Sequence, residues 1–228
     1  PEGLRMTEIF SVLNKKSYEN QGMYERYVFD KAFINSLKLP IDVSTLEGFL
    51  FPETYKFTKD TSEPMILRTM VSTFLKKVPS DYHVKASKVN LSYYEAVTLA
   101  SIIEKETSIA NERRLIASVF HNRLKKKMKL QTDPTVIYGI KNFNGNLTRK
   151  QLRTPTPYNT YTNYGLPPTP IANPGLASLM AAVDPADTEY LFFVAKGDGT
   201  HIFSTNYKEH KKAVKKYQKR RSKSYRSY

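Results

Sequence analysis

The sequence predicts an α+β protein in which helices dominate and the strands are short. Three observations lead to this prediction. Several stretches place apolar residues at helical spacing, residues 190–204 have the pattern of a β-hairpin, and continuous apolar strands alternating with helices occur nowhere in the chain. A doubly wound parallel sheet is therefore not expected.

The size and composition are those of an ordinary globular protein. The chain has 228 residues, of which 40% are hydrophobic, which suffices for a sizeable core and for one domain plus a small module. It has no cysteine, so disulfides and thiolate metal sites are excluded, and its four histidines lack the spacing of metal ligands. We therefore expect no metal and no other cofactor.

The charge of the chain is concentrated near its C-terminal end. The net charge of +15 favours an anionic partner such as nucleic acid, a membrane surface or an acidic polymer. Residues 207–228 hold ten Lys or Arg against one acidic residue, a local +9 that leaves +6 for the other 206 residues. We treat residues 208–228 as a basic tail that aids attachment to anionic surfaces. Nucleic acid is not expected, because no RNP motif or zinc-ligand set is present.

The first third of the chain predicts short helices and one irregular segment. Apolar spacing predicts helices within residues 7–13, 24–37 and 62–78, the first of them capped by its threonine. Residues 46–57 mix aromatic side chains with glycine and proline, which predicts strand and turn. Glu53 lies in this segment and is a candidate for lining a cleft, although a single acid in a turn is more often solvated.

The central helix delivers a carboxylate at its C-terminal end. Ser92 and Glu95 have the spacing of a capping box, and the apolar stripe that follows borders Glu104. A glutamate at the edge of an apolar surface is partly desolvated, which suits it to act as a general acid. Glu106 is rotated about 200° away around the helix, so the two acids are not expected to work as a pair. The alternative is that Glu104 is a solvated side chain beside Lys105.

The second half continues with helices and one long loop. Residues 111–128 predict an amphipathic helix, and Asp133 is a candidate N-cap of a helix that begins at Pro134. Residues 154–175 are too proline-rich for regular structure, and loops of this length are usually functional or disordered. Their tyrosines argue against disorder. Asn173 is expected to cap a further helix that runs through Val183.

Six motifs occur along the chain in a fixed order: L-E-G-F-L-F-P-E-T-Y (residues 46–55), A-S-I-I-E-K-E-T (100–107), F-H-N-R-L (120–124), L-Q-T-D-P-T-V-I-Y-G (130–139), Y-N-T-Y (158–161) and G-L-P-P-T-P-I-A-N-P-G (165–175). Together they resemble the YceG-type family of endolytic murein transglycosylases, also called MltG. The resemblance covers nearly the whole chain.

The resemblance implies a domain organisation and a location. Residues 1–39 would belong to a LysM-like module that the chain enters partway, residues 40–207 to the transglycosylase catalytic domain and residues 208–228 to the tail. Family members are typically tethered to the bacterial inner membrane by an N-terminal helix, with the catalytic domain outside the cytoplasm. The tether is expected upstream of Pro1. Peptidoglycan strands are the expected partner, with the cell-wall synthesis machinery as a further candidate.

The resemblance also implies a lyase reaction in which Glu104 is the catalytic acid and base. Glu104 would protonate the β-1,4 oxygen between N-acetylmuramic acid and N-acetylglucosamine, and then take the proton of the muramyl C6 hydroxyl as that oxygen closes on C1. The product is a 1,6-anhydro end, and because the nucleophile is intramolecular one carboxylate suffices. Candidate substrate-binding or helper residues, each with an alternative role as loop scaffolding, are Glu53, Gln131, Asp133, Tyr138, Asn159 and Tyr161.

A different class of function stays open from the sequence. The basic surface is also compatible with a non-catalytic binder of an anionic glycan or of nucleic acid. Such a binder would release no anhydro product from peptidoglycan.

Overall fold

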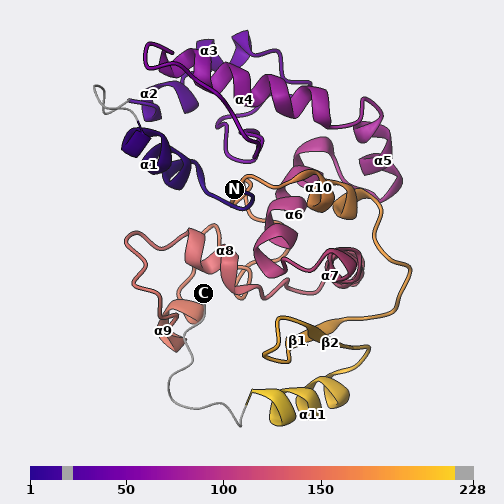
Figure 1. Cartoon of the computed structure of the whole chain (residues 1–228). Helices are drawn as coiled ribbons and strands as arrows, with labels where there is room; N and C mark the ends of the chain where they lie inside the picture. The colour runs from indigo at the N-terminus through magenta and orange to yellow at the C-terminus, as the bar shows by residue number, and fades with distance from the viewer. Residues whose placement is uncertain (17–22, 219–228) are drawn as a thin grey trace. The chain divides into compact units, whose positions relative to one another are not determined.

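The computed structural model of the chain describes residues 1–16 and 23–218 (Figure 1). Its elements in chain order are α1 (Met6–Lys16), α2 (Glu25–Val28), α3 (Lys31–Ser36), α4 (Glu63–Lys77), α5 (Tyr82–Lys88), α6 (Tyr93–Glu106), α7 (Ala110–Lys125), α8 (Asp133–Tyr138), α9 (Arg149–Arg153), α10 (Leu176–Val183), β1 (Phe192–Ala195), β2 (His201–Ser204) and α11 (Tyr207–Tyr217). The helix-rich α+β fold predicted from the sequence is confirmed. Across these described residues, every helix is too short or too polar to traverse a bilayer.

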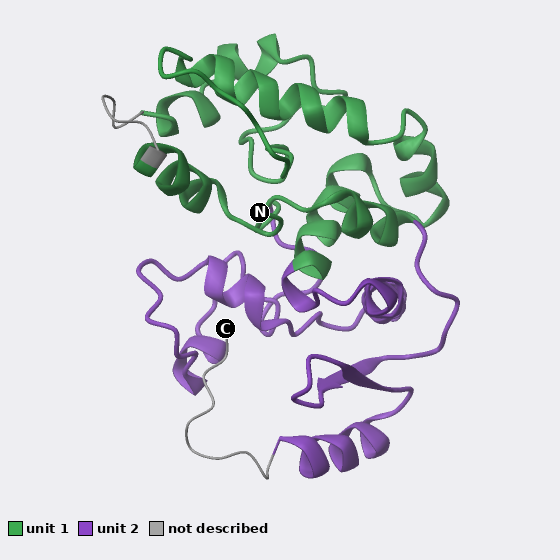
Figure 2. Cartoon of the chain, viewed as in Figure 1, with its two compact units in different colours: residues 1–104, 169–183 green, residues 105–168, 184–228 purple. Residues whose placement is uncertain are grey.

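The chain divides into two compact units (Figure 2). Unit 1 comprises Pro1–Glu104 and Thr169–Val183, and unit 2 comprises Lys105–Pro168 and Asp184–Tyr228. Helix α6 therefore contributes residues to both units. The boundaries of these units differ from those of the predicted modules 1–39, 40–207 and 208–228. The LysM-like assignment stays a prediction.

The core of unit 1 is built around α4 and α6. Every residue of α6 from Ala96 to Ile103 is buried, because this part of the helix carries apolar or small side chains on all sides. Helix α4 covers residues predicted to be helical and buries its apolar stripe. The ring of Phe49 lies 5.1 Å from that of Phe74 on α4 and 6.2 Å from that of Tyr94 on α6.

The strand predicted within residues 46–57 is wrong. These residues form turns and irregular structure, although Phe49, Leu50 and Phe51 are buried. The reason is tertiary, since the N–H groups of Gly48 and Leu50 donate to the side chain of Asn173 and not to a neighbouring strand. Gly48 has a φ of +90°, and a Cβ there would lie 2.6 Å from the Pro170 side chain.

The single helix predicted over residues 24–37 is interrupted. The structure divides it into α2 and α3, because the Asp30 carboxylate accepts a hydrogen bond from the N–H of Phe33 and caps a new helix. The expected cap at Thr7 is also wrong, since α1 begins at Met6 and includes Thr7.

The β-hairpin of unit 2 confirms the prediction for residues 190–204. Strands β1 and β2 pair antiparallel, with Phe192 opposite Ser204 and Ala195 opposite His201. Helix α11 contacts both strands, and His210 stacks on Phe192 with ring centroids 5.0 Å apart. Most of the residues predicted as the first part of the tail therefore form a packed helix, whereas residues 219–228 lie outside the described chain.

Candidate active site

Glu104 lies near the C-terminal end of α6, as the sequence predicts. The capping box is present at the other end, where the Glu95 carboxylate accepts from the N–H of Ser92 at 2.8 Å and the Ser92 hydroxyl accepts from the N–H of Glu95 at 3.2 Å. Glu104 follows the buried Ile103 and is itself half-buried. Its Oε2 accepts a hydrogen bond from the N–H of Gly175 at 3.0 Å, so the carboxyl group has a fixed orientation.

A buried asparagine fixes the chain immediately before this donor. Asn173 is 1% exposed, and its Oδ1 accepts from the N–H groups of Gly48 at 3.0 Å and Leu50 at 2.9 Å. Its Nδ2 donates to the carbonyl of Leu4 at 3.0 Å and to the carboxylate of Glu47 at 2.9 Å. The Asn173 side chain therefore joins its loop to Leu4 and to residues 47–50. Its predicted role as a helix N-cap is wrong, because α10 begins three residues later.

The same loop is also held against α6. The Ser101 hydroxyl accepts from the N–H of Ile171 at 3.0 Å, and both residues are buried. Gly175 then leads into α10, whose first turn contains no acidic residue. The loop before α10 thus has a defined position relative to Glu104, which lies on the adjoining turn of the same helix as Ser101.

Unit 2 holds two acidic residues in neighbouring hydrogen bonds, Asp133, which the sequence indicated as a candidate, and Glu106, which it did not. The Thr132 hydroxyl donates to the carboxyl group of Glu106, and the Tyr161 hydroxyl donates to Asp133 at 2.6 Å. Burial raises the pKa of Glu106 to about 7, and the charge of Asp133 adds to this increase while Thr132 and Arg123 oppose it. Glu106 is therefore an acid that titrates near neutral pH.

Asp133 does not cap α8. Thr132 occupies the N-cap position, Asp133 is the first helical residue, and Pro134 follows it. The Asp133 carboxylate instead accepts from Tyr161. Burial and the charge of Asp133 raise the pKa of Tyr161, so its hydroxyl is a hydrogen-bond donor at any physiological pH.

Arg123 has a structural role next to these residues. Its guanidinium donates to the carbonyls of Leu191 at 2.7 Å and Leu130 at 2.8 Å, and it lies 5.1 Å from the Phe192 ring. Burial lowers the pKa of Arg123. These contacts tie α7 to the start of the hairpin and to the segment that leads into α8.

The Asn159 side chain forms its hydrogen bonds with neighbouring residues of the same segment, 151–161. It is fully buried, its Nδ2 donates to the carbonyls of Gln151, Leu152 and Thr154, and its Oδ1 accepts from the N–H of Tyr161 at 2.9 Å. This geometry favours the scaffolding role for Asn159. Its effect is to position Tyr161.

Gln131 and Tyr138 lie on either side of Asp133 in the sequence. Gln131 is exposed and has a φ of +51°, an uncommon conformation for a residue other than glycine that is often found near functional sites. Its N–H donates to the carbonyl of Thr160 at 3.1 Å. The ring of Tyr138 packs on that of Tyr158 with centroids 4.8 Å apart.

Glu53 lies in unit 1 and has a conventional partner. Its carboxylate pairs with Lys77 at 3.2 Å, and both side chains are largely exposed. The N–H of Thr54 and then the Lys77 ammonium hold the pKa of Glu53 below its usual value. This favours the solvated alternative for Glu53.

The candidate residues thus form two groups that belong to different units. Unit 1 supplies Glu104 and Glu53, whereas unit 2 brings together Asp133, Asn159 and Tyr161 around the start of α8. Glu106 and Thr132 were missed, because no local pattern signals that a glutamate beside an exposed lysine accepts a hydrogen bond from a threonine 26 residues away. The G-L-P-P-T-P-I-A-N-P-G motif could have indicated the Gly175 donor, since a conformationally restricted loop is suited to presenting a backbone N–H.

Comparisons with known proteins agree on one family. The model of the YceG-like family matches residues 1–216. An endolytic murein transglycosylase of Bacillus subtilis strain 168 is 40% identical over 229 residues, which cover 95% of this chain and 63% of that protein. One of Streptococcus pneumoniae R6 is 32% identical over 175 residues, covering 74% of this chain and 32% of that protein. The chain therefore spans less than two thirds of these relatives.

A solved structure resembles this fold closely. The crystal structure of a yceG-like protein of Listeria monocytogenes superimposes with a TM-score of 0.84 and 36% sequence identity, over 93% of this chain and 74% of that one. The family model, the sequence relatives and this structure lead to the same conclusion: the chain belongs to the YceG-like family.

Proposed function

We propose that this chain is a lytic transglycosylase that cleaves peptidoglycan strands internally at the β-1,4 bond between N-acetylmuramic acid and N-acetylglucosamine. The relatives named endolytic murein transglycosylase support the reaction class. The observation that carries the assignment to a residue is the half-buried Glu104 carboxyl group, oriented by the N–H of Gly175 at 3.0 Å. The proposed location is the bacterial cell envelope, where the substrate is.

In the proposed mechanism Glu104 acts twice. Protonated Glu104 donates its proton to the glycosidic oxygen while positive charge develops on the muramyl ring. The carboxylate then accepts the proton of the C6 hydroxyl as O6 bonds to C1. The glycan strand is thus cleaved without water, and the product ends in 1,6-anhydro-N-acetylmuramic acid. The hydrogen bond from Gly175 keeps the carboxyl group in one orientation through both steps, which lowers the entropic cost of reaching the transition state.

This reaction requires one carboxylic acid at the bond, in contrast to hydrolysis by a carboxylate pair. Asp133, Tyr161, Gln131 and Tyr138 of unit 2 are proposed to contact sugars of the peptidoglycan strand, since phenol, amide and carboxylate groups form hydrogen bonds with acetamido sugars and aromatic rings cover their faces. Asn159 is proposed to act indirectly by holding Tyr161.

The test is digestion of purified peptidoglycan by the wild type and by Glu104→Gln, with the products identified by mass spectrometry. Gln keeps the size of the side chain and an oxygen that accepts from Gly175, but it has no proton to transfer. We expect anhydromuramyl ends from the wild type and a loss of turnover of about 10²- to 10⁴-fold or more in Glu104→Gln, with an unchanged thermal melt.

The matched control is Glu106→Gln, which makes the same change two residues away and is expected to reduce turnover much less. Near-normal anhydro product from Glu104→Gln would contradict the proposed role of Glu104. Reducing ends alone from the wild type would indicate hydrolysis. Binding without any cleavage would favour the alternative of a non-catalytic glycan binder.

A further inference from the structure

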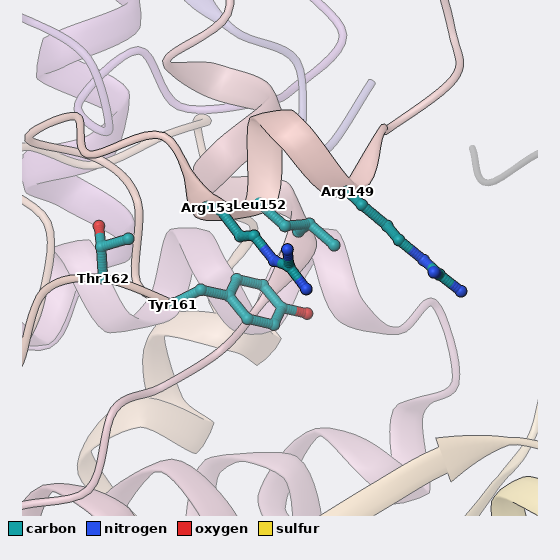
Figure 3. Close-up of a pocket in the computed structure, with 5 residues that line it drawn as sticks. All are labelled: Arg149, Leu152, Arg153, Tyr161 and Thr162. Carbon is teal, nitrogen blue, oxygen red and sulfur yellow. The ribbon is translucent and has the colours of Figure 1, made fainter.

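Unit 2 contains a pocket whose two arginine side chains have no part in the proposed chemistry. It has a volume of about 460 Å³, within the usual range for a bound organic group, and is lined by Arg149, Leu152, Arg153, Tyr161 and Thr162 (Figure 3). The pocket therefore combines two cationic side chains, an aromatic ring and an aliphatic side chain.

The two arginines are placed together by α9. Arg149 and Arg153 are four residues apart on this helix, so their side chains leave the same face. In Figure 3 the side chains of Arg149 and Arg153 both extend from α9, that of Arg149 from its first turn. Both groups are exposed to solvent.

Although α9 is short, hydrogen bonds hold it at both ends. A capping box joins Thr148 and Gln151 at its start, with the Thr148 hydroxyl accepting from the N–H of Gln151 at 3.2 Å. At its end, the buried amide of Asn159 donates to three carbonyl groups, of which that of Thr154 is the closest at 2.7 Å. Asn159 also accepts from the N–H of Tyr161, so one residue fixes both walls of the pocket.

The positive charge in the pocket is not balanced by an acidic neighbour. In residues 1–16 and 23–218, neither Arg149 nor Arg153 forms an ion pair with a carboxylate. Asp133 accepts from the Tyr161 hydroxyl and does not line the pocket. Two guanidinium groups without an acidic partner favour an anionic ligand, and the planar fork of arginine matches a carboxylate.

We propose that Arg149 and Arg153 form a subsite that binds a carboxylate of the peptidoglycan strand. The inference rests on the proposed function for the identity of the ligand. Two carboxylates are chemically suitable, one on the peptide attached to N-acetylmuramic acid and one on the lactyl group that is free where the peptide has been removed. In either case the subsite holds the strand by its charged substituents, whereas Glu104 acts on the sugar backbone.

The test is a binding measurement on strands that stay intact. In the Glu104→Gln background, isothermal titration calorimetry compares soluble peptidoglycan strands with the same strands after their carboxylates have been converted to amides. We expect the double variant Arg149→Gln/Arg153→Gln to bind native strands about 10- to 100-fold more weakly, because the carboxylate then loses its charge-assisted hydrogen bonds to two solvent-exposed guanidinium groups. Amidated strands should bind equally weakly to both proteins.

The matched control is Lys141→Gln/Lys150→Gln, which removes the same charge from exposed positions of unit 2 outside the pocket. A loss of affinity as large as that of the arginine variant would overturn the subsite, because it would reduce the effect to net charge. Unchanged binding by the arginine variant would overturn it too, as would wild-type binding that ignores amidation. A thermal melt checks that both variants fold.

Two further comparisons identify the ligand and separate this inference from the proposed function. Strands treated with an amidase carry only lactyl carboxylates. Arginine-dependent binding to these strands would identify the lactyl carboxylate as the ligand, and arginine-dependent binding only to peptide-bearing strands would identify the peptide carboxylate. Either result supports the subsite. If the wild type released no anhydro ends but bound strands through the arginines, the proposed reaction would fail and the subsite would stand. If it bound no strands at all, the subsite would be overturned.

Discussion

Glu104 and Glu106 lie two residues apart on α6, yet their carboxyl groups have different hydrogen-bond partners. In unit 1, Glu104 is half-buried and accepts a backbone N–H from Gly175 in the loop before α10. In unit 2, Glu106 accepts from the Thr132 hydroxyl, and burial together with the negative charge of Asp133 raises its pKa to about 7. One carboxyl group accepts a hydrogen bond from a backbone N–H, and the other accepts from a side-chain hydroxyl.

The difference shows that helical position alone does not decide which acid is unusual. Rotation around the helix separates the two residues, as expected, and Glu106, which lies away from the predicted stripe, has a raised pKa. We infer that Glu104 performs the chemistry because its orientation is fixed, and that Glu106 serves the structure around Thr132 and Asp133.

The largest effect is expected when the support of Glu104 is removed. Asn173→Ala leaves the N–H groups of Gly48 and Leu50 and the Glu47 carboxylate without this partner in a buried place. The free energy of unfolding should fall by about 3 kcal/mol, measured by chemical denaturation. Asn146→Ala, at an exposed position, should change it by less than about 0.5 kcal/mol. Equal effects of the two variants would show that the hydrogen bonds of the Asn173 side chain do not contribute this stability.

A second prediction concerns the pH dependence that Glu106 gives to stability. Its pKa is about 7 in the folded state against an ordinary 4.5, so folding favours the protonated form. The stabilisation is fully present below about pH 4.5 and is lost as the pH rises through 7. Relative to Glu106→Gln, the wild type should lose at most about 3 kcal/mol between pH 4.5 and 8.

The measurement is chemical denaturation of both proteins across this pH range. Gln keeps the oxygen that accepts from Thr132 but does not titrate, so every other pH-dependent contribution cancels in the difference. Parallel profiles for the two proteins would mean that Glu106 has an ordinary pKa, and the contrast with Glu104 would then be one of hydrogen bonding alone.

The smallest effect is expected at the hydrogen bond between Tyr161 and Asp133. Tyr161→Phe removes one donor and keeps the ring, so the free energy of unfolding should fall by about 1 kcal/mol. If the hydroxyl also contacts substrate, KM for soluble strands should rise more than kcat falls. Tyr164→Phe, at an exposed ring in the same loop, is the control. A larger effect on kcat than on KM would place Tyr161 nearer the chemistry than we propose.

Features that depend on neighbouring residues in the chain were predictable from the sequence. The Ser92 capping box, the helices α4 and α7, the hairpin β1–β2 and the position of Glu104 at the end of an apolar helix all appear as expected. Each follows from periodicity, caps or turn residues within one or two turns of the chain, and such interactions are nearly independent of the rest of the fold.

Features that depend on distant segments were decided by the tertiary structure alone. Asn173 and Asp133 have side chains suited to capping, but each has a stronger set of partners elsewhere in the chain. Glu106 resembles a solvated residue in the sequence, whereas in the fold Thr132, 26 residues further on, donates a hydrogen bond to it. Burial and hydrogen-bond competition are properties of the packed chain, because a polar group bonds to whichever partner the fold brings to it once water is excluded.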